Sequence, residues 1–345
     1  MSISNNLSSY KQLEPCYILR PIGYYLIFLW VFGISLNGSI LYIFIRYKKL
    51  RQSSTNIFIG SLILTDFIGA CFEIPMPGIA LIKCRWIFGY AGCVFEAVIA
   101  YFSGCSNMYI LCLLSLDRYF VVTRSFTATT ITIKQTYTSI LCAYIFALFW
   151  TLMPIIGWSS YDFEGTGASC SIKWEERSFN VLSYNMTILL FVYLIPVIII
   201  FITNINVFKI VREHRRCTNI NFSASYIRRQ LAMEHRVTHT VIFIIGGFLL
   251  AWTPYAISVF IRVFIDEHLL SPLSGTIPAL FAKTSVVWNP FIYIIRNGNF
   301  RRFLPIFAYH RIQKKRKSSN PTHFSVYPYS AVHLPLPASS NIPGN

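Results

Sequence analysis

The stretch LLSPLSGTIPALFAKTSVVWNPFIYIIR, residues 269–296, decides the fold of this chain. It is long enough to cross a bilayer as a helix, which takes about 20 mostly apolar residues. Between Leu269 and Ile295, Lys283 is the only charged side chain. A cation at membrane depth costs roughly 2.5–3.5 kcal/mol on insertion scales. We therefore expect a carboxylate partner, a water-lined cavity or chemistry that needs an amine to offset that cost.

Two uses of Lys283 compete. A lysine can extend its stem so that the ammonium reaches the membrane interface. Arg296, at the end of the stretch, is about 20 Å away along a helix at ~1.5 Å per residue, which is too far for that stem. A desolvated lysine amine can instead form a Schiff base with an aldehyde or a ketone. The position of Lys283 favours this chemical use.

The composition indicates a membrane protein, because 54% of the 345 residues are hydrophobic and only 12% are charged. A soluble domain carries about twice that share of charge. We expect an all-α membrane protein, a seven-transmembrane helix bundle with its N-terminus outside. The apolar stretches long enough to span are 22–45, 56–82, 90–116, 137–157, 182–208, 240–265 and 273–295.

Basic residues set the orientation. Of the 30 lysines and arginines, 22 fall in the segments 46–52, 118–134 and 209–236 and in the tail from residue 296. An excess of basic residues marks the cytoplasmic face, so we expect a multi-pass protein of the plasma membrane. The net charge of +17 then faces anionic lipid and needs no nucleic-acid partner.

The spans divide the chain into three parts. We expect an extracellular segment over residues 1–21, a seven-helix membrane domain over 22–309 and a disordered cytoplasmic tail over 310–345. The membrane domain closes with a short amphipathic eighth helix at residues 298–309, which would lie on the inner leaflet. No metal site is predicted.

Four cysteines are predicted on the outer face, where disulfides persist. A Cys93–Cys170 bridge would fix the long outer loop over the bundle, and Cys16–Cys84 is a second candidate pair. Asn6 begins an Asn-Leu-Ser glycosylation sequon on the same face.

Polar signatures recur in order along the spans. They are Asn37, Asp66, Asp117-Arg118-Tyr119, Pro196, Trp252-Thr253-Pro254-Tyr255 and Asn289-Pro290-Phe291-Ile292-Tyr293. Together they resemble the rhodopsin-type, or class A, G-protein-coupled receptors over about residues 22–309. The resemblance implies a heterotrimeric G-protein partner, with arrestin and a receptor kinase acting on the tail, and a receptor rather than an enzyme.

Within that family the chain is similar to the opsins. Lys283 lies six residues before Asn289, where opsins carry the lysine that binds retinal. Glu96 follows Cys93 by three residues, and Glu164 ends the loop sequence Trp158-Ser159-Ser160-Tyr161-Asp162-Phe163-Glu164. The resemblance implies cis-retinal bound covalently as a protonated Schiff base, with Glu96 or Glu164 as its counterion.

Glu73 is a third candidate counterion. It follows Asp66 by two helical turns on the same face, so it points toward the same interior. Its alternative is a neutral, hydrogen-bonded carboxyl, because buried carboxyls readily take up a proton. Our hypothesis is that Glu96 is the counterion in the dark.

Matched positions imply the remaining site residues. The retinal pocket would contain Ala100, Gly104, Tyr161, Tyr193, Phe248, Trp252 and Tyr255. On the inner face, Asp117 and Glu234 would hold Arg118 beside Tyr119, while Asn289, Pro290 and Tyr293 would repack near Asp66 and Asn37 on activation.

Three rival functions fit these residues less well. A retinal photoisomerase would share Lys283 but would not need the Asp117-Arg118-Tyr119 switch. A class A receptor for a diffusible ligand would not need Glu96 and Glu164 together. A retinal-driven ion pump would lack the receptor signatures.

Overall fold

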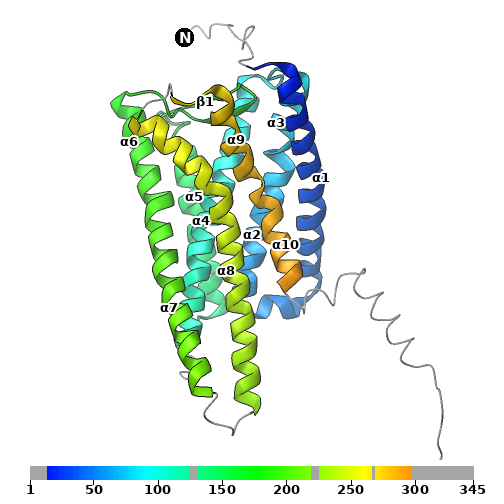
Figure 1. Cartoon of the computed structure of the whole chain (residues 1–345), viewed down its shortest axis with the longest axis vertical. Coiled ribbons are helices and arrows are strands. Elements are labelled where there is room, and N and C mark those ends of the chain that lie inside the picture. Colours follow the sequence, from blue (N-terminus) through cyan, green and yellow to red (C-terminus); the bar gives the residue numbers. More distant parts are fainter. Residues whose placement is uncertain (1–13, 124–130, 219–224, 266–268, 297–345) are drawn as a thin grey trace, which may run out of the picture. The chain divides into compact units, whose positions relative to one another are not determined.

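A computed structural model describes residues 14–123, 131–218, 225–265 and 269–296, with side chains described outside 213–235 (Figure 1). Several predictions lie outside the described residues: Asn6, the eighth helix at 298–309, the tail at 310–345 and the side chain of Glu234.

The described elements form a helix bundle with one β-hairpin (Figure 1). The α-helices are α1 (Cys16–Arg46), α2 (Ser54–Phe72), α3 (Pro75–Lys83), α4 (Gly89–Thr123), α5 (Ile133–Leu152), α6 (Phe179–Ile188), α7 (Ile195–Thr218), α8 (Ser225–Phe260), α9 (Pro272–Lys283) and α10 (Ser285–Arg296). A 3-10 turn η1 (Lys48–Gln52), the π-helical segments η2 (Leu189–Leu194) and η3 (Ile261–Ile265), and the strands β1 (Tyr161–Glu164) and β2 (Ser169–Ile172) complete them.

The seven predicted spans are confirmed. Six helical segments of the described chain are long and apolar enough to cross a membrane, and the seventh consists of α9 followed by α10. The fourth is shorter than predicted, because α5 ends at Leu152 rather than at residue 157. Pro154 contributes to this end, because a proline has no backbone N–H to donate to Trp150 O.

Polar and apolar residues are arranged as a membrane requires. Large apolar side chains point outward, including Phe28, Phe201 and Leu250, each more than 60% exposed. Asp66 and Glu96 are completely buried. Charged groups inside a membrane protein face the bundle interior, so this distribution identifies the chain as a multi-pass membrane protein.

Prolines interrupt three of the spans. A proline cannot donate a backbone hydrogen bond, so the helix before it must rearrange. Before Pro196, the backbone N–H of Ile195 reaches five residues back to Leu190 O, which makes the π-helical segment η2. Before Pro75, Ile74 N likewise bonds Gly69 O at 3.4 Å. The second span is therefore divided between α2 and α3.

The seventh span is divided at Thr284, between α9 and α10. Pro290 leaves Val286 O without its usual helical donor. Asn37 of α1 replaces that donor, since its Nδ2 lies 2.8 Å from Val286 O and 2.9 Å from Gly33 O. A side chain of the first span thus stabilises the break in the seventh.

An antiparallel hairpin of β1 and β2 lies at the end of the bundle where α1 begins (Figure 1). Its register pairs Tyr161 with Ile172 and Glu164 with Ser169. Both candidate disulfides are present: Cys93–Cys170 joins β2 to α4, and Cys16–Cys84 joins the start of α1 to the end of α3. The hairpin is therefore held covalently over the outer end of the bundle.

We expect Asn37→Leu to lower the free energy of unfolding by about 1–3 kcal/mol, because it leaves Val286 O buried without a donor. Thermal unfolding of the detergent-solubilised receptor measures this change. The control is Ser39→Ala, since the exposed Ser39 hydroxyl bonds only Ser35 O in its own helix. Equal losses in the two variants would contradict the role of Asn37.

Candidate functional site

Lys283 lies at the point where the seventh span breaks. It is the last residue of α9, and its side chain is only 7% exposed. Its Nζ lies 2.9 Å from Glu73 Oε1 and 2.8 Å from Glu96 Oε1. Such short distances between opposite charges are those of strong, charge-assisted hydrogen bonds. Lys283 therefore has two carboxylate partners, Glu73 and Glu96.

The two carboxylates come from different kinds of position. Glu73 occupies the break between α2 and α3, whereas Glu96 lies within α4, one turn after Cys93. Glu96 has further donors: Cys170 N lies 2.8 Å from its Oε2, and Ser169 Oγ lies 3.2 Å from its Oε1. Strand β2 thus supplies two hydrogen bonds to Glu96, and the Cys93–Cys170 disulfide holds that strand in place.

Glu164 ends β1 and is 6% exposed. Among the described residues, Lys283 forms ion pairs with Glu73 and Glu96 but not with Glu164. Burial raises the pKa of the Glu164 carboxyl to about 7, and the charges of Arg262 and Lys283 oppose that rise. Burial therefore favours the protonated form of this carboxyl over a wider pH range than in an exposed glutamate.

Arg262 is a site residue that the sequence analysis missed. It lies in η3, its side chain is 6% exposed, and its Nη1 is 3.1 Å from Glu175 Oε1. The guanidinium also lies against Gly275 of α9, where there is no room for a Cβ. A charged residue near the end of an apolar span was the available signal.

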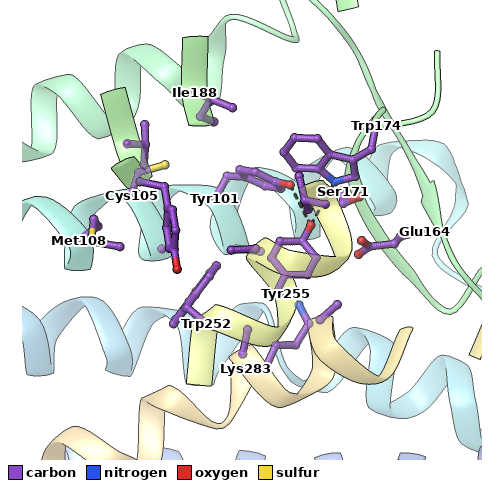
Figure 2. Close-up of a pocket in the computed structure, with 18 of the residues that line it drawn as sticks. Tyr101, Cys105, Met108, Glu164, Ser171, Trp174, Ile188, Trp252, Tyr255 and Lys283 are labelled. Atoms are coloured by element: carbon purple, nitrogen blue, oxygen red, sulfur yellow. Dashed lines mark hydrogen bonds between the residues drawn. The ribbon is translucent and has the colours of Figure 1, made fainter. Parts of the chain in front are cut away.

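A cavity opens beside Lys283 (Figure 2). Its wall is mostly apolar and aromatic, as in small-molecule sites. Lys283 and Glu164 lie toward one end, with Cys105 and Met108 at the other (Figure 2). Of the predicted pocket residues, the lining includes Ala100, Gly104, Tyr193, Phe248, Trp252 and Tyr255.

Tyr161 does not line the cavity, which corrects the prediction for that residue. Its hydroxyl donates to Thr151 O at 2.8 Å, and its ring packs 6.0 Å from that of Tyr101. Tyr101 faces the cavity instead, and its hydroxyl lies 3.1 Å from that of Tyr255. Trp174 Nε1 also donates to the Tyr255 hydroxyl, at 3.2 Å. Three rings therefore form a hydrogen-bonded wall (Figure 2).

Gly104 allows Trp252 to lie directly against α4. A Cβ at Gly104 would be 2.6 Å from Trp252 Cη2, which is closer than any real contact. On its other side, Trp252 Nε1 donates to Ser285 Oγ at 3.2 Å. The indole therefore connects α4 with the first residue of α10.

The inner-face residues gather in two groups. Asp117 forms an ion pair with Arg118 at 2.8 Å and accepts a hydrogen bond from Thr55 Oγ1 at 2.9 Å. Deeper in the bundle, Asp66 accepts hydrogen bonds from Asn107 at 2.7 Å and from Asn289 at 2.8 Å.

Two other inner-face residues lie near these groups. Tyr293 is completely buried, with its ring 6.3 Å from that of Phe44. Tyr119 follows the ion pair, with its ring 5.8 Å from that of Phe120. Asn37 bonds Val286 O and Gly33 O rather than Asp66.

The comparisons with known proteins agree with this architecture. The family model described as 7 transmembrane receptor (rhodopsin family) matches residues 36–293. The chain is 34% identical over 281 residues to the human visual pigment-like receptor peropsin, covering 81% of this chain and 82% of peropsin. It is 32% identical over 286 residues to the G0-coupled rhodopsin of Mizuhopecten yessoensis, covering 82% and 70% respectively.

The fold is also that of a solved structure. The crystal structure of squid rhodopsin aligns with 94% of this chain and 97% of its own, with a TM-score of 0.80. The sequences are 24% identical over that alignment, so the likeness concerns the arrangement of the helices.

We expect Arg262→Leu to change how stability depends on pH in the retinal-free receptor. An unfolded glutamate titrates near pH 4.3, whereas the folded pKa of Glu164 is about 7. The folded state therefore holds an extra proton between these values, and stability falls as pH rises to about 7 and then levels. Without Arg262 that pKa rises further, so stability should keep falling above pH 7, by about 1.4 kcal/mol per unit of rise.

Melting temperatures at pH 6, 7 and 8 measure this effect. Glu175→Gln is the control, because it removes only the exposed partner of Arg262. Combining Arg262→Leu with Glu164→Gln should remove the additional slope. Identical slopes for the wild type and Arg262→Leu between pH 7 and 8 would refute the coupling.

Proposed function

Because this chain belongs to the rhodopsin family of seven-transmembrane receptors and, within it, to the opsins, we propose that it is a light-sensing G-protein-coupled receptor that carries retinal on Lys283. The observation that carries this proposal is the buried Lys283 amine on the cavity wall, between Glu73 and Glu96. The chain acts in signalling and resides in the plasma membrane.

The residues present fit retinal. The cavity offers one amine and an apolar, aromatic wall, as in sites that bind small apolar molecules. When bound to Lys283 Nζ as a protonated Schiff base, cis-retinal supplies a light-driven isomerisation. Trp252, Tyr255, Phe248, Gly104 and Ala100, which all line the cavity, would hold the retinal there.

Glu96 is proposed as the counterion in the dark. It is completely buried, it contacts Lys283 Nζ, and it accepts hydrogen bonds from Cys170 N and Ser169 Oγ. Hydrogen bonds to a carboxylate stabilise its ionised form. Glu164 is the less direct candidate, because Arg262 and not Lys283 is the largest opposing charge near it.

Trp252 is proposed to transmit a change in the cavity to the helices. It lies between Gly104 of α4 and Ser285 at the start of α10. A displacement of the indole toward or away from α4 would alter one of these two contacts, because the ring lies close against Gly104 and is hydrogen-bonded to Ser285. The displacement would reach Asn289 and Asp66 through α10.

On the inner face, the Asp117–Arg118 ion pair and the Thr55 hydrogen bond link α4 with α2. Release of this pair, together with repacking of Tyr293, would open the inner end for a heterotrimeric G protein. The similarity to a G0-coupled rhodopsin makes that class of G protein the first to test. Arrestin and a receptor kinase are proposed as partners of the tail.

We expect the receptor expressed in cells and mixed with 11-cis-retinal in the dark to form a visible-absorbing pigment. Borohydride trapping followed by mass spectrometry should find the retinyl adduct on the peptide that contains Lys283. Lys283→Met is the control and should form no pigment. A folded, retinal-treated receptor without the adduct would refute the proposal.

We expect Arg118→Gln to keep the dark spectrum and to lose most light-dependent nucleotide exchange, because Arg118 lies on the inner face, away from the cavity. The control is Lys134→Gln, which removes an exposed cation of the same face and should leave exchange unchanged. If the wild-type pigment isomerises retinal but never stimulates exchange with any G-protein class, the photoisomerase function is favoured instead.

A further inference from the structure

Two carboxylates contact the Lys283 ammonium, and its single positive charge can balance only one of them. Glu73 and Glu96 both lie within 3 Å of Nζ, and none of the three side chains is more than 8% exposed. Two carboxylates beside one cation in a low-dielectric site do not both ionise, and they hold protons as a coupled pair. The same charge balance holds for the free ammonium and for a protonated Schiff base. The pair therefore retains one proton.

The hydrogen bonds indicate which carboxyl retains it. Glu96 accepts from a backbone N–H and a hydroxyl in addition to Lys283. In the described structure, the only donor to Glu73 is Lys283. Since donors stabilise a carboxylate, Glu96 is the carboxyl that stays ionised and Glu73 is the one that keeps the proton.

A second observation is a buried hydroxyl near Glu73 that could accept a hydrogen bond from a protonated carboxyl. Ser103 Oγ is buried and has no hydrogen-bond partner among the described residues. Glu73 Oε2 and Ser103 Oγ border the same space beside Gly69, each within 3.3 Å of the point that a Cβ there would occupy. An O–H on Glu73 would therefore have a buried acceptor close by.

We propose that Glu73 is a proton-holding partner of Glu96: it is neutral in the resting receptor and becomes the counterion whenever Glu96 is neutral. The exchange breaks the O–H bond of Glu73 and forms one on Glu96, so the net charge of the site does not change. This inference rests on the proposed function only in taking the cation to be a Schiff base after retinal binds.

Few other charges act on the pair. Asp66 lies inward of Glu73 on α2 and is bonded to the neutral amides of Asn107 and Asn289. Glu164 approaches from β1, with Arg262 beyond it. The other charged residues of the elements packed around α2 lie at or near the helix ends; they are Arg20, Arg46, Lys48, Lys49, Arg51, Lys83, Asp117, Arg118, Lys134 and Arg296. Lys283 is thus the cation whose charge Glu73 would balance.

The first test compares pigments of the wild type, Glu73→Gln, Glu96→Gln and the double variant, with absorption recorded against pH. Glu73→Gln should change the spectrum little, because a neutral amide replaces a neutral acid. Glu96→Gln should stay visible at neutral pH, but the pH at which the visible band gives way to an ultraviolet band should fall by about one unit, a tenfold loss of proton affinity. The double variant should absorb in the ultraviolet at neutral pH.

Two spectral outcomes would overturn the proposal. In one, Glu96→Gln alone absorbs in the ultraviolet at neutral pH, so Glu73 does not replace it. In the other, the double variant stays visible, so another anion serves the site.

The second test needs no retinal. Infrared spectra of the retinal-free receptor should show a protonated-carboxyl component that is lost in Glu73→Gln, whatever the fate of the Glu96 variants. Asp66→Asn and Glu164→Gln identify the contributions of the other two buried carboxyls. A band unaffected by Glu73→Gln would overturn the inference while leaving the pigment intact, whereas a normal band in a receptor that forms no pigment would overturn only the proposed function.

Discussion

The whole site follows from one constraint, which is that an amine at membrane depth must be neutralised within hydrogen-bond distance. Lys283 meets it with two carboxylates from two other spans. Because the interior screens charge poorly, these contacts fix the positions of the second, third and seventh spans relative to one another. The outer hairpin joins the same network through Cys170 N and Ser169 Oγ. Packing, loop position and chemistry therefore depend on the same ion pairs.

Glu73 and Lys283 both lie where a membrane-spanning helix is interrupted. Pro75 follows Glu73 closely, and Pro290 follows Lys283 by two turns. Each proline removes a backbone donor, and the local rearrangement is satisfied inside the bundle rather than by lipid. The Asn37 contact with Val286 O is one such repair. Residues that weaken a helix are thus concentrated beside the residues with a proposed role in light sensing.

The spans and the burial of Lys283 could be predicted from sequence, because apolar length and an isolated cation are local signals. Glu73 was placed on the correct face because α2 is regular up to that residue and breaks only after it. Tyr161 was misplaced, since side-chain direction in a loop strand depends on pairing with β2, which the sequence does not specify. Arg262 was missed for a related reason: its partners Glu175 and Gly275 come from segments that meet only in the folded bundle.

The Cys93–Cys170 disulfide also bears on how the receptor is made. The strand it secures supplies two of the donors that stabilise Glu96. Disulfides form in the oxidising lumen of the secretory pathway. The electrostatic environment of the chromophore site is therefore completed during biosynthesis, before the protein reaches the cell surface, and a chain that leaves the endoplasmic reticulum with these thiols reduced would carry an unfinished site.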